Sequence, residues 1–156
     1  MRKNSGFTAM ELAVSLAIMA VIASLVLPPY LTWLRGHRLR GAVTNLMADL
    51  EMAKIRAIRE NSLIAVQFCQ DRYTIFNENG DTNYTCVTTG REVYRDRRLP
   101  SGVEIDLGYL TFVDNRTRFN GRGLPDGITT GQTIPVKNNT HGQEISINRL
   151  GYMTVQ

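Results

Sequence analysis

Hydrophobic and polar positions divide this chain of 156 residues into an apolar run, an amphipathic run and a polar remainder. The apolar run covers residues 12–34, and its 23 residues include no charged side chain. A helix needs about 20 such residues to cross the hydrocarbon core of a bilayer. Ser15, Ser24 and Thr32 are mild interruptions, because each can bond back to a carbonyl of its own helix. A buried helix of a soluble domain would show one polar face, so the run predicts a membrane-spanning helix.

A second helical pattern follows and extends to Glu60. Apolar residues recur there at spacings of four and three, which predicts one buried stripe made of Leu39, Val43, Leu46, Leu50, Ala53 and Ala57. The pattern places the charged residues off this stripe, Asp49 among them. Arg56 and Glu60 are spaced for a weak ion pair on the helix surface. Asn61 and Ser62 are predicted to end the helix.

The remainder of the chain is predicted to be β-structure. Short stretches rich in β-branched and aromatic residues alternate there with turn residues such as Asn-Gly and Asp-Gly. The predicted strands cover residues 63–69, 73–77, 92–95, 103–107, 109–113, 132–136, 144–148 and 152–155.

Two features near the N-terminus set the apolar run apart from an ordinary secretory signal. Glu11 lies next to the run, and a carboxylate in a membrane is costly unless it is paired, so it is a functional candidate. Residues 1–6 are basic and end in Gly6, so the small residue precedes the apolar run instead of following it. Cleavage after Gly6 would remove only the basic leader and leave the apolar helix on the mature chain.

The basic leader followed by Gly6, Phe7, Thr8 and Glu11 resembles the class III signal of type IV pilins and type II secretion pseudopilins. The resemblance implies that a membrane prepilin peptidase cuts after Gly6 and methylates the new N-terminal Phe7. Glu11 matches the acidic position of that family. The free amine of Phe7 in one subunit would pair with Glu11 of its neighbour and set the filament register. Pro28 matches the position of a helix-kinking proline.

The C-terminal part narrows the resemblance. Residues 53–61, the strand that ends in Cys69, and residues 119–125 resemble the FimT, FimU and GspH group of minor pilins and H-type pseudopilins. This implies an α+β, pilin-like fold in which a long N-terminal helix packs on an antiparallel β-sheet head. The implied divisions are a cleaved leader (1–6), a transmembrane and filament-core helix (7–34), an amphipathic helix of the head (35–60) and a β-rich head (61–156).

Charge and cysteine content refine this interpretation. Removal of the leader takes away Arg2 and Lys3 and lowers the net charge from +4 to +2, so the basic balance is weak evidence for nucleic-acid binding. Cys69 and Cys86 lie in the part expected to be exported, where disulfides form. A bond between them would close a loop of about 17 residues and contribute roughly 3 kcal/mol, whereas two separate thiols are the alternative.

One basic cluster is a weak candidate for DNA contact, because Glu92 and Asp96 dilute its charge: Arg91, Arg95, Arg97 and Arg98. A solvated face or a subunit contact is the favoured interpretation of this cluster. Competence-linked FimT proteins contact DNA through a C-terminal Gly-Arg-x-Arg. The matching residues 151–154 are Gly-Tyr-Met-Thr and lack both arginines, which argues against DNA uptake by that mode.

No pattern in the sequence indicates catalysis. His37 and His141 have no metal-ligand spacing, and the acidic residues have no calcium-loop spacing, so neither an enzyme, a cofactor nor a metal is expected.

The resemblance implies a minor type IV pilin that helps prime or assemble the pilus, in the filament or at its tip. One alternative is the H-type minor pseudopilin of a type II secretion system, and a second is a DNA-binding pilin of a competence pilus. The expected location is the bacterial inner membrane, with a cytoplasmic N-terminus and a periplasmic head, and later the filament. The expected partners are the prepilin peptidase and other pilin or pseudopilin subunits, without a small-molecule substrate and without DNA.

Overall fold

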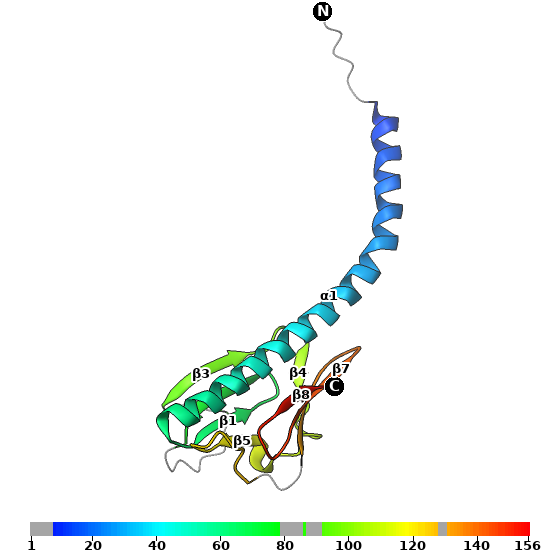
Figure 1. Cartoon of the computed structure of the whole chain (residues 1–156). Helices are drawn as coiled ribbons and strands as arrows, with labels where there is room; N and C mark the ends of the chain where they lie inside the picture. The colour runs from blue at the N-terminus through cyan, green and yellow to red at the C-terminus, as the bar shows by residue number, and fades with distance from the viewer. Residues whose placement is uncertain (1–7, 79–85, 87–91, 128–130) are drawn as a thin grey trace, which may run out of the picture. The chain divides into compact units, whose positions relative to one another are not determined.

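One helix, α1 (Ala9–Glu60), contains both helical patterns of the sequence (Figure 1). The computed structural model describes residues 8–78, 86, 92–127 and 131–156. Thr8 begins the helix, because its Oγ1 accepts the backbone N–H of Glu11 at 3.2 Å. Asn61 ends it with a φ of 47°, and the amide of Ser62 donates to the carbonyl of Ala57 at 3.2 Å. The predicted helix end is therefore confirmed.

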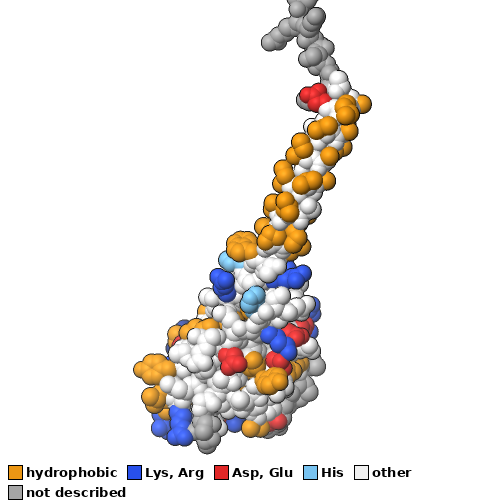
Figure 2. All heavy atoms as spheres, turned by 90° about the vertical axis from the view of Figure 1, so that its right-hand side faces the viewer, with side chains coloured by type: hydrophobic (Ala, Val, Ile, Leu, Met, Phe, Trp, Pro, Cys, Tyr) orange, Lys and Arg blue, Asp and Glu red, His pale blue; other side chains and the backbone are white. Residues whose placement is uncertain are grey.

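The residues of α1 up to Arg35 belong to a unit of their own. Hydrophobic side chains cover this part of the helix and are exposed, as Figure 2 shows for one face. Among the described residues, α1 is the one helix that is long and apolar enough to cross a membrane. The helix continues through Pro28 and Pro29, and the kink at Pro28 stays a prediction.

The polar residues of the apolar run bond within their own helix, as predicted. The Ser15 hydroxyl donates to the Glu11 carbonyl at 2.8 Å, and the Ser24 hydroxyl donates to the Val21 carbonyl at 2.7 Å. The Thr32 hydroxyl donates to the Pro28 carbonyl, one turn back, at 3.2 Å. These bonds remove the need for an outside partner, so the three residues do not oppose a membrane location.

The second unit, Gly36–Gln156, combines the C-terminal part of α1 with two antiparallel four-stranded sheets. The strand order is β3-β2-β1-β5 in the first sheet and β4-β6-β7-β8 in the second. The first sheet consists of β1 (Ile64–Phe68), β2 (Arg72–Asn77), β3 (Val93–Arg98) and β5 (Arg116–Phe119). The second sheet consists of β4 (Val103–Ile105), β6 (Gln132–Asn138), β7 (Gly142–Ile147) and β8 (Met153–Val155).

One hydrophobic core joins the helix to both sheets. Figure 1 shows the C-terminal part of α1 lying across the strands of the first sheet. All six residues of the predicted stripe are buried in this core, together with Ala42. Asp49 is buried as well, which the sequence pattern did not predict. It lies three residues after Leu46 and four before Ala53, so the helix geometry directs its side chain toward the core.

Two details of the β-structure differ from the sequence predictions. The strand predicted at residues 109–113 is wrong. These residues lead from a turn at Asp106, whose carbonyl accepts the Tyr109 amide at 3.2 Å, to the short helix η1 (Val113–Asn115). The prediction also missed β5, because two of its four residues are arginines. Arg116 is nevertheless buried, since it has buried polar partners.

Candidate functional site

The first candidate is the N-terminal part of α1. Glu11 lies in the first turn, where a negative charge interacts favourably with the helix dipole, and its backbone N–H is capped by Thr8. The proposed role of Glu11 in setting the filament register stays a prediction. Gly6 and Phe7 lie outside the described residues, so the proposed cleavage and methylation sites stay predictions.

A buried polar cluster centres on Asp49. Its Oδ2 accepts the Tyr73 hydroxyl proton at 2.7 Å and lies 2.9 Å from Nε of Arg97, while its Oδ1 lies 2.7 Å from Nη1 of Arg95. Asp49 is only 3% exposed, and Tyr73 is fully buried. Burial raises the pKa of Tyr73 well above its ordinary value, and the hydrogen bond to Asp49 adds to this effect. The cluster ties the helix to β2 and β3.

This cluster bears on the basic residues proposed for DNA contact. Arg95 and Arg97 lie on β3 and share the single carboxylate of Asp49, which offsets one of their two positive charges. Arg98 is exposed, and Arg91 lies outside the described residues. DNA contact through this group remains a prediction, but two of its four arginines stabilise the fold. The sequence offered one signal, which is a lone aspartate beside a predicted apolar stripe.

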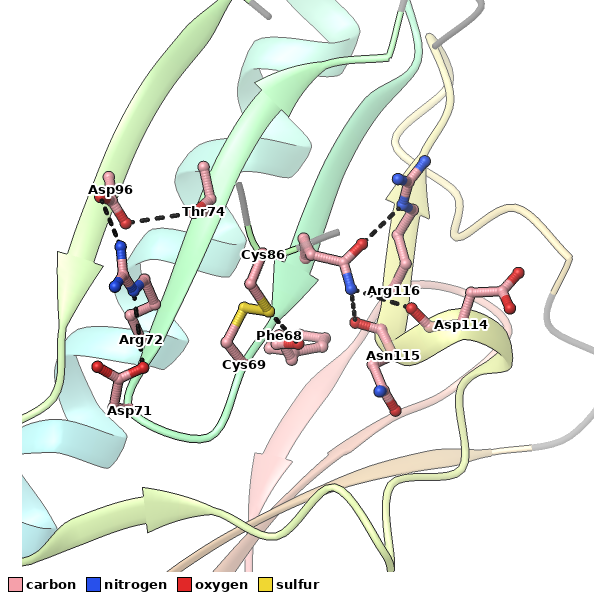
Figure 3. Close-up of a disulfide and its surroundings, with 11 residues drawn as sticks. Phe68, Cys69, Asp71, Arg72, Thr74, Cys86, Asp96, Asp114, Asn115 and Arg116 are labelled. Atoms are coloured by element: carbon pink, nitrogen blue, oxygen red, sulfur yellow. Dashed lines mark hydrogen bonds and ion pairs between the residues drawn. A yellow bond between two sulfur atoms is a disulfide. The ribbon is translucent and has the colours of Figure 1, made fainter. Parts of the chain in front are cut away.

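The disulfide predicted between Cys69 and Cys86 is present (Figure 3). The two Cα atoms lie 6.1 Å apart, within the usual range. Cys69 directly follows β1, and the bond attaches to it a residue 17 positions further along the chain. The disulfide therefore links the connection between β2 and β3 to the middle of the first sheet.

A second buried polar cluster lies beside the disulfide and was not predicted. Arg116 donates to Glu78 at 2.8 Å and to the Gln67 side-chain oxygen at 3.1 Å (Figure 3 shows Arg116). The Gln67 amide in turn donates to the backbone carbonyls of Asp114 and Asn115 at 3.0 and 3.2 Å. Asp114 and Asn115 both have a positive φ. These bonds join β1, β5 and η1 into one rigid region.

The surface holds a shallow hollow of about 600 Å³ on the second sheet. Its lining includes Asp106, Tyr109, Lys137 and Glu144, and it contains neither a histidine, a cysteine nor a serine. Lys137 donates a hydrogen bond to Asp106, which lowers the pKa of Asp106 and raises the pKa of Lys137. No group of three or more metal-ligating side chains occurs among the described residues, and His37 and His141 are both exposed. The residues that line the hollow include no nucleophile paired with a base.

Comparisons with known proteins show which proteins this chain resembles. The family model of the type II transport protein GspH matches residues 42–151. A comparison with curated proteins finds no match. Among solved structures, the type IV minor pilin FimU of Pseudomonas aeruginosa is similar, with a TM-score of 0.58 and 16% identity over 77% of this chain and 89% of FimU. A second crystal form of FimU gives a TM-score of 0.56 at the same identity, over 76% of this chain and 92% of FimU.

A pseudopilin structure is similar to the same extent. The minor pseudopilin EpsH from the type 2 secretion system of Vibrio cholerae has a TM-score of 0.56 and 11% identity, over 76% of this chain and 96% of EpsH. At such low identity these structures establish the fold: a long N-terminal helix packed on antiparallel sheets.

Proposed function

Because this chain belongs to the family of the type II transport protein GspH, we propose that it is the H-type minor pseudopilin of a type II secretion system. Membership of this family makes the chain a pilin-like structural subunit and not an enzyme. The observation that supports the secretion assignment is the GspH match, which covers most of the helix-and-sheet unit. The sequence prediction favoured a minor type IV pilin. That role is now the second candidate, supported by the similarity to FimU, which concerns the fold alone.

The proposed mechanism is insertion of an apolar helix into a filament. A helix with exposed hydrophobic side chains on all sides must be covered by lipid or by other helices. We infer that residues 7–34 cross the inner membrane while the head lies in the periplasm, and that neighbouring pseudopilin helices replace the lipid during assembly. The proposed partners are therefore other pseudopilins, together with a prepilin peptidase that cuts after Gly6 and methylates Phe7.

Glu11 is proposed to set the register of this helix within the filament. A carboxylate among apolar helices needs a positive partner, and the α-amine created by cleavage before Phe7 provides one on a neighbouring subunit. We expect Glu11→Ala to be cleaved normally but to be lost from the filament. Glu51→Ala, which removes a carboxylate from the head portion of the same helix, is the matched control. Normal incorporation of the Glu11→Ala chain would contradict the proposed role.

The decisive experiment is a deletion strain in which secreted proteins and surface pili are measured side by side. Secretion substrates trapped in the periplasm, with normal pili, are expected for an H-type pseudopilin. Sparse pili with normal secretion would instead support the minor type IV pilin. Complementation with the unmodified chain must restore the lost property, so that the defect is assigned to this chain alone.

A further inference from the structure

Two turns of identical hydrogen bonding lie at residues 120–124 and 148–152, and we call them the twin turns. Each turn begins with an asparagine, Asn120 or Asn148. Its side-chain oxygen accepts the backbone N–H groups of the residues two and four positions ahead, over 2.9 to 3.1 Å. The asparagine carbonyl accepts the N–H of the glycine three residues ahead, over 2.8 and 2.9 Å. Gly123 and Gly151 have φ values of 75° and 73°, which favour glycine. Both turns are therefore rigid.

The twin turns pack against each other and against the end of α1. A Cβ added to Gly151 would lie 2.9 Å from the carbonyl oxygen of Gly123, and one added to Gly123 would lie 2.7 Å from Cδ1 of Ile58. The Lys54 ammonium donates to the carbonyl of Gly151 at 2.8 Å and lies 5.9 Å from the centre of the Tyr152 ring. The turns and the last two helical turns of α1 thus form one surface.

Four large hydrophobic side chains of this surface are exposed to solvent. Ile55 and Ile58 on α1 are 54% and 48% exposed, and Leu150 and Tyr152 on the second turn are 65% and 66% exposed. Clustered apolar side chains on an otherwise polar surface usually indicate a protein interface. The helix and the hydrogen-bonded turns hold the backbone of these residues in place, so that binding costs little further backbone freedom.

Three arginines lie on the same elements as these hydrophobic side chains. Arg122 and Arg149 belong to the twin turns, and Arg59 follows Ile58 on the helix; all three are exposed. None of them has an ion-pair partner within the described part of the chain. The nearest carboxylates along α1 are occupied elsewhere: Glu60 binds Arg56 at 3.3 Å, and Glu51 lies 3.8 Å from Lys54.

We propose that Ile55, Ile58, Arg59, Arg122, Arg149, Leu150 and Tyr152, the twin-turn face, dock onto an acidic, partly apolar face of another pilin-like subunit. Charge complementarity identifies the partner's chemistry, because carboxylates of a partner can pair with these three guanidinium groups, which have no ion-pair partner in the described part of the chain. The exposed aliphatic side chains of the face favour a protein over a nucleic acid, since the phosphates of a nucleic acid would leave them uncovered. This inference rests on the proposed function in a filament.

The test uses the full-length chain in cells that assemble the filament. A photoreactive p-benzoylphenylalanine replaces Tyr152, and cross-links to epitope-tagged pilin-like subunits of the same system are measured. Arg122→Glu and Arg149→Glu are compared with Arg98→Glu, which reverses an exposed arginine on β3. The reversals are not expected to unfold the chain, because neither side chain has a partner in the described part of the chain. Formation of the Cys69–Cys86 disulfide checks this.

We expect a cross-link to one pilin-like subunit whose yield falls about tenfold or more in each twin-turn variant and is unchanged by Arg98→Glu. Reversing an acidic residue in the cross-linked partner segment should restore the yield. Absence of the cross-link, an equal yield in all variants, or a product with nucleic acid, lipid or a second copy would overturn the proposal. If secretion needs the chain but is unchanged by Arg122→Glu and Arg149→Glu, the proposed docking face is overturned and the proposed function is not. Normal secretion in the absence of the chain would contradict the proposed function itself.

Discussion

Replacement of Asp49 by alanine is expected to destabilise the head by about 2–4 kcal/mol. Loss of the acceptor for the buried Tyr73 hydroxyl accounts for about 1–3 kcal/mol. The ion pairs with Arg95 and Arg97 add less than about 1 kcal/mol each, because these arginine side chains are 40% and 35% exposed and return to water when the carboxylate is removed.

Urea unfolding of the full chain in detergent micelles, followed by near-ultraviolet circular dichroism of the head tyrosines, measures this loss. Glu51→Ala is the matched control, since Glu51 lies two residues away on α1 and makes only a 3.8 Å contact with Lys54. The control should change the free energy of unfolding by less than about 0.5 kcal/mol. Hydrogen exchange at the β3 amides should rise in the Asp49 variant more than exchange in β7. Equal unfolding midpoints for the two variants would refute the reasoning.

Three further outcomes are expected in the same unfolding assay. The pKa of Tyr73 is raised in the folded chain, so its contribution to stability is complete below the ordinary tyrosine pKa of about 10 and declines as the pH rises above it; Tyr73→Phe should flatten this alkaline loss, and an unchanged profile would contradict it. Joint replacement of Cys69 and Cys86 by serine should lower the free energy of unfolding by about 3 kcal/mol, and an unchanged free energy of unfolding would argue against a stabilising disulfide. Gly151→Ala should cost about 1–3 kcal/mol, because a Cβ there meets the Gly123 carbonyl at a positive φ, whereas Gly41→Ala, with open space around it, should not destabilise.

The head of the chain, and not its N-terminal part, separates a pseudopilin from a type IV pilin. The leader and the apolar run are shared by pilins and pseudopilins, so they cannot distinguish a pilus from a secretion system. The distinguishing residues lie in the head, and the GspH match covers residues 42–151 there. The C-terminal residues 151–154 lack the arginines of DNA-binding FimT proteins, and Arg95 and Arg97 bind Asp49. Both observations favour an assembly role over DNA uptake.

The arrangement of the twin turns could not be predicted from their sequences. Each contains an asparagine followed three residues later by a glycine, which predicts a turn but not its location. The first turn follows β5, which pairs with β1 in the first sheet, and the second turn lies between β7 and β8, which pair in the second sheet. Their contact with α1 therefore depends on how the two sheets and the helix pack together. The exposed hydrophobic side chains around them become a surface only through this packing.

Local periodicity determined the apolar run, the buried stripe of α1, the helix end at Asn61 and most of the strands. These features depend on neighbours within a few residues, so a single stretch of sequence contains the necessary information. Tertiary structure alone decided that Asp49 is buried and that Arg116, the first residue of β5, is buried. Each polar group is stable there only because partners from distant segments, such as Tyr73 and Glu78, offset the cost of removing it from water. A hydrophobicity pattern cannot anticipate such partners, since they meet only in the folded chain.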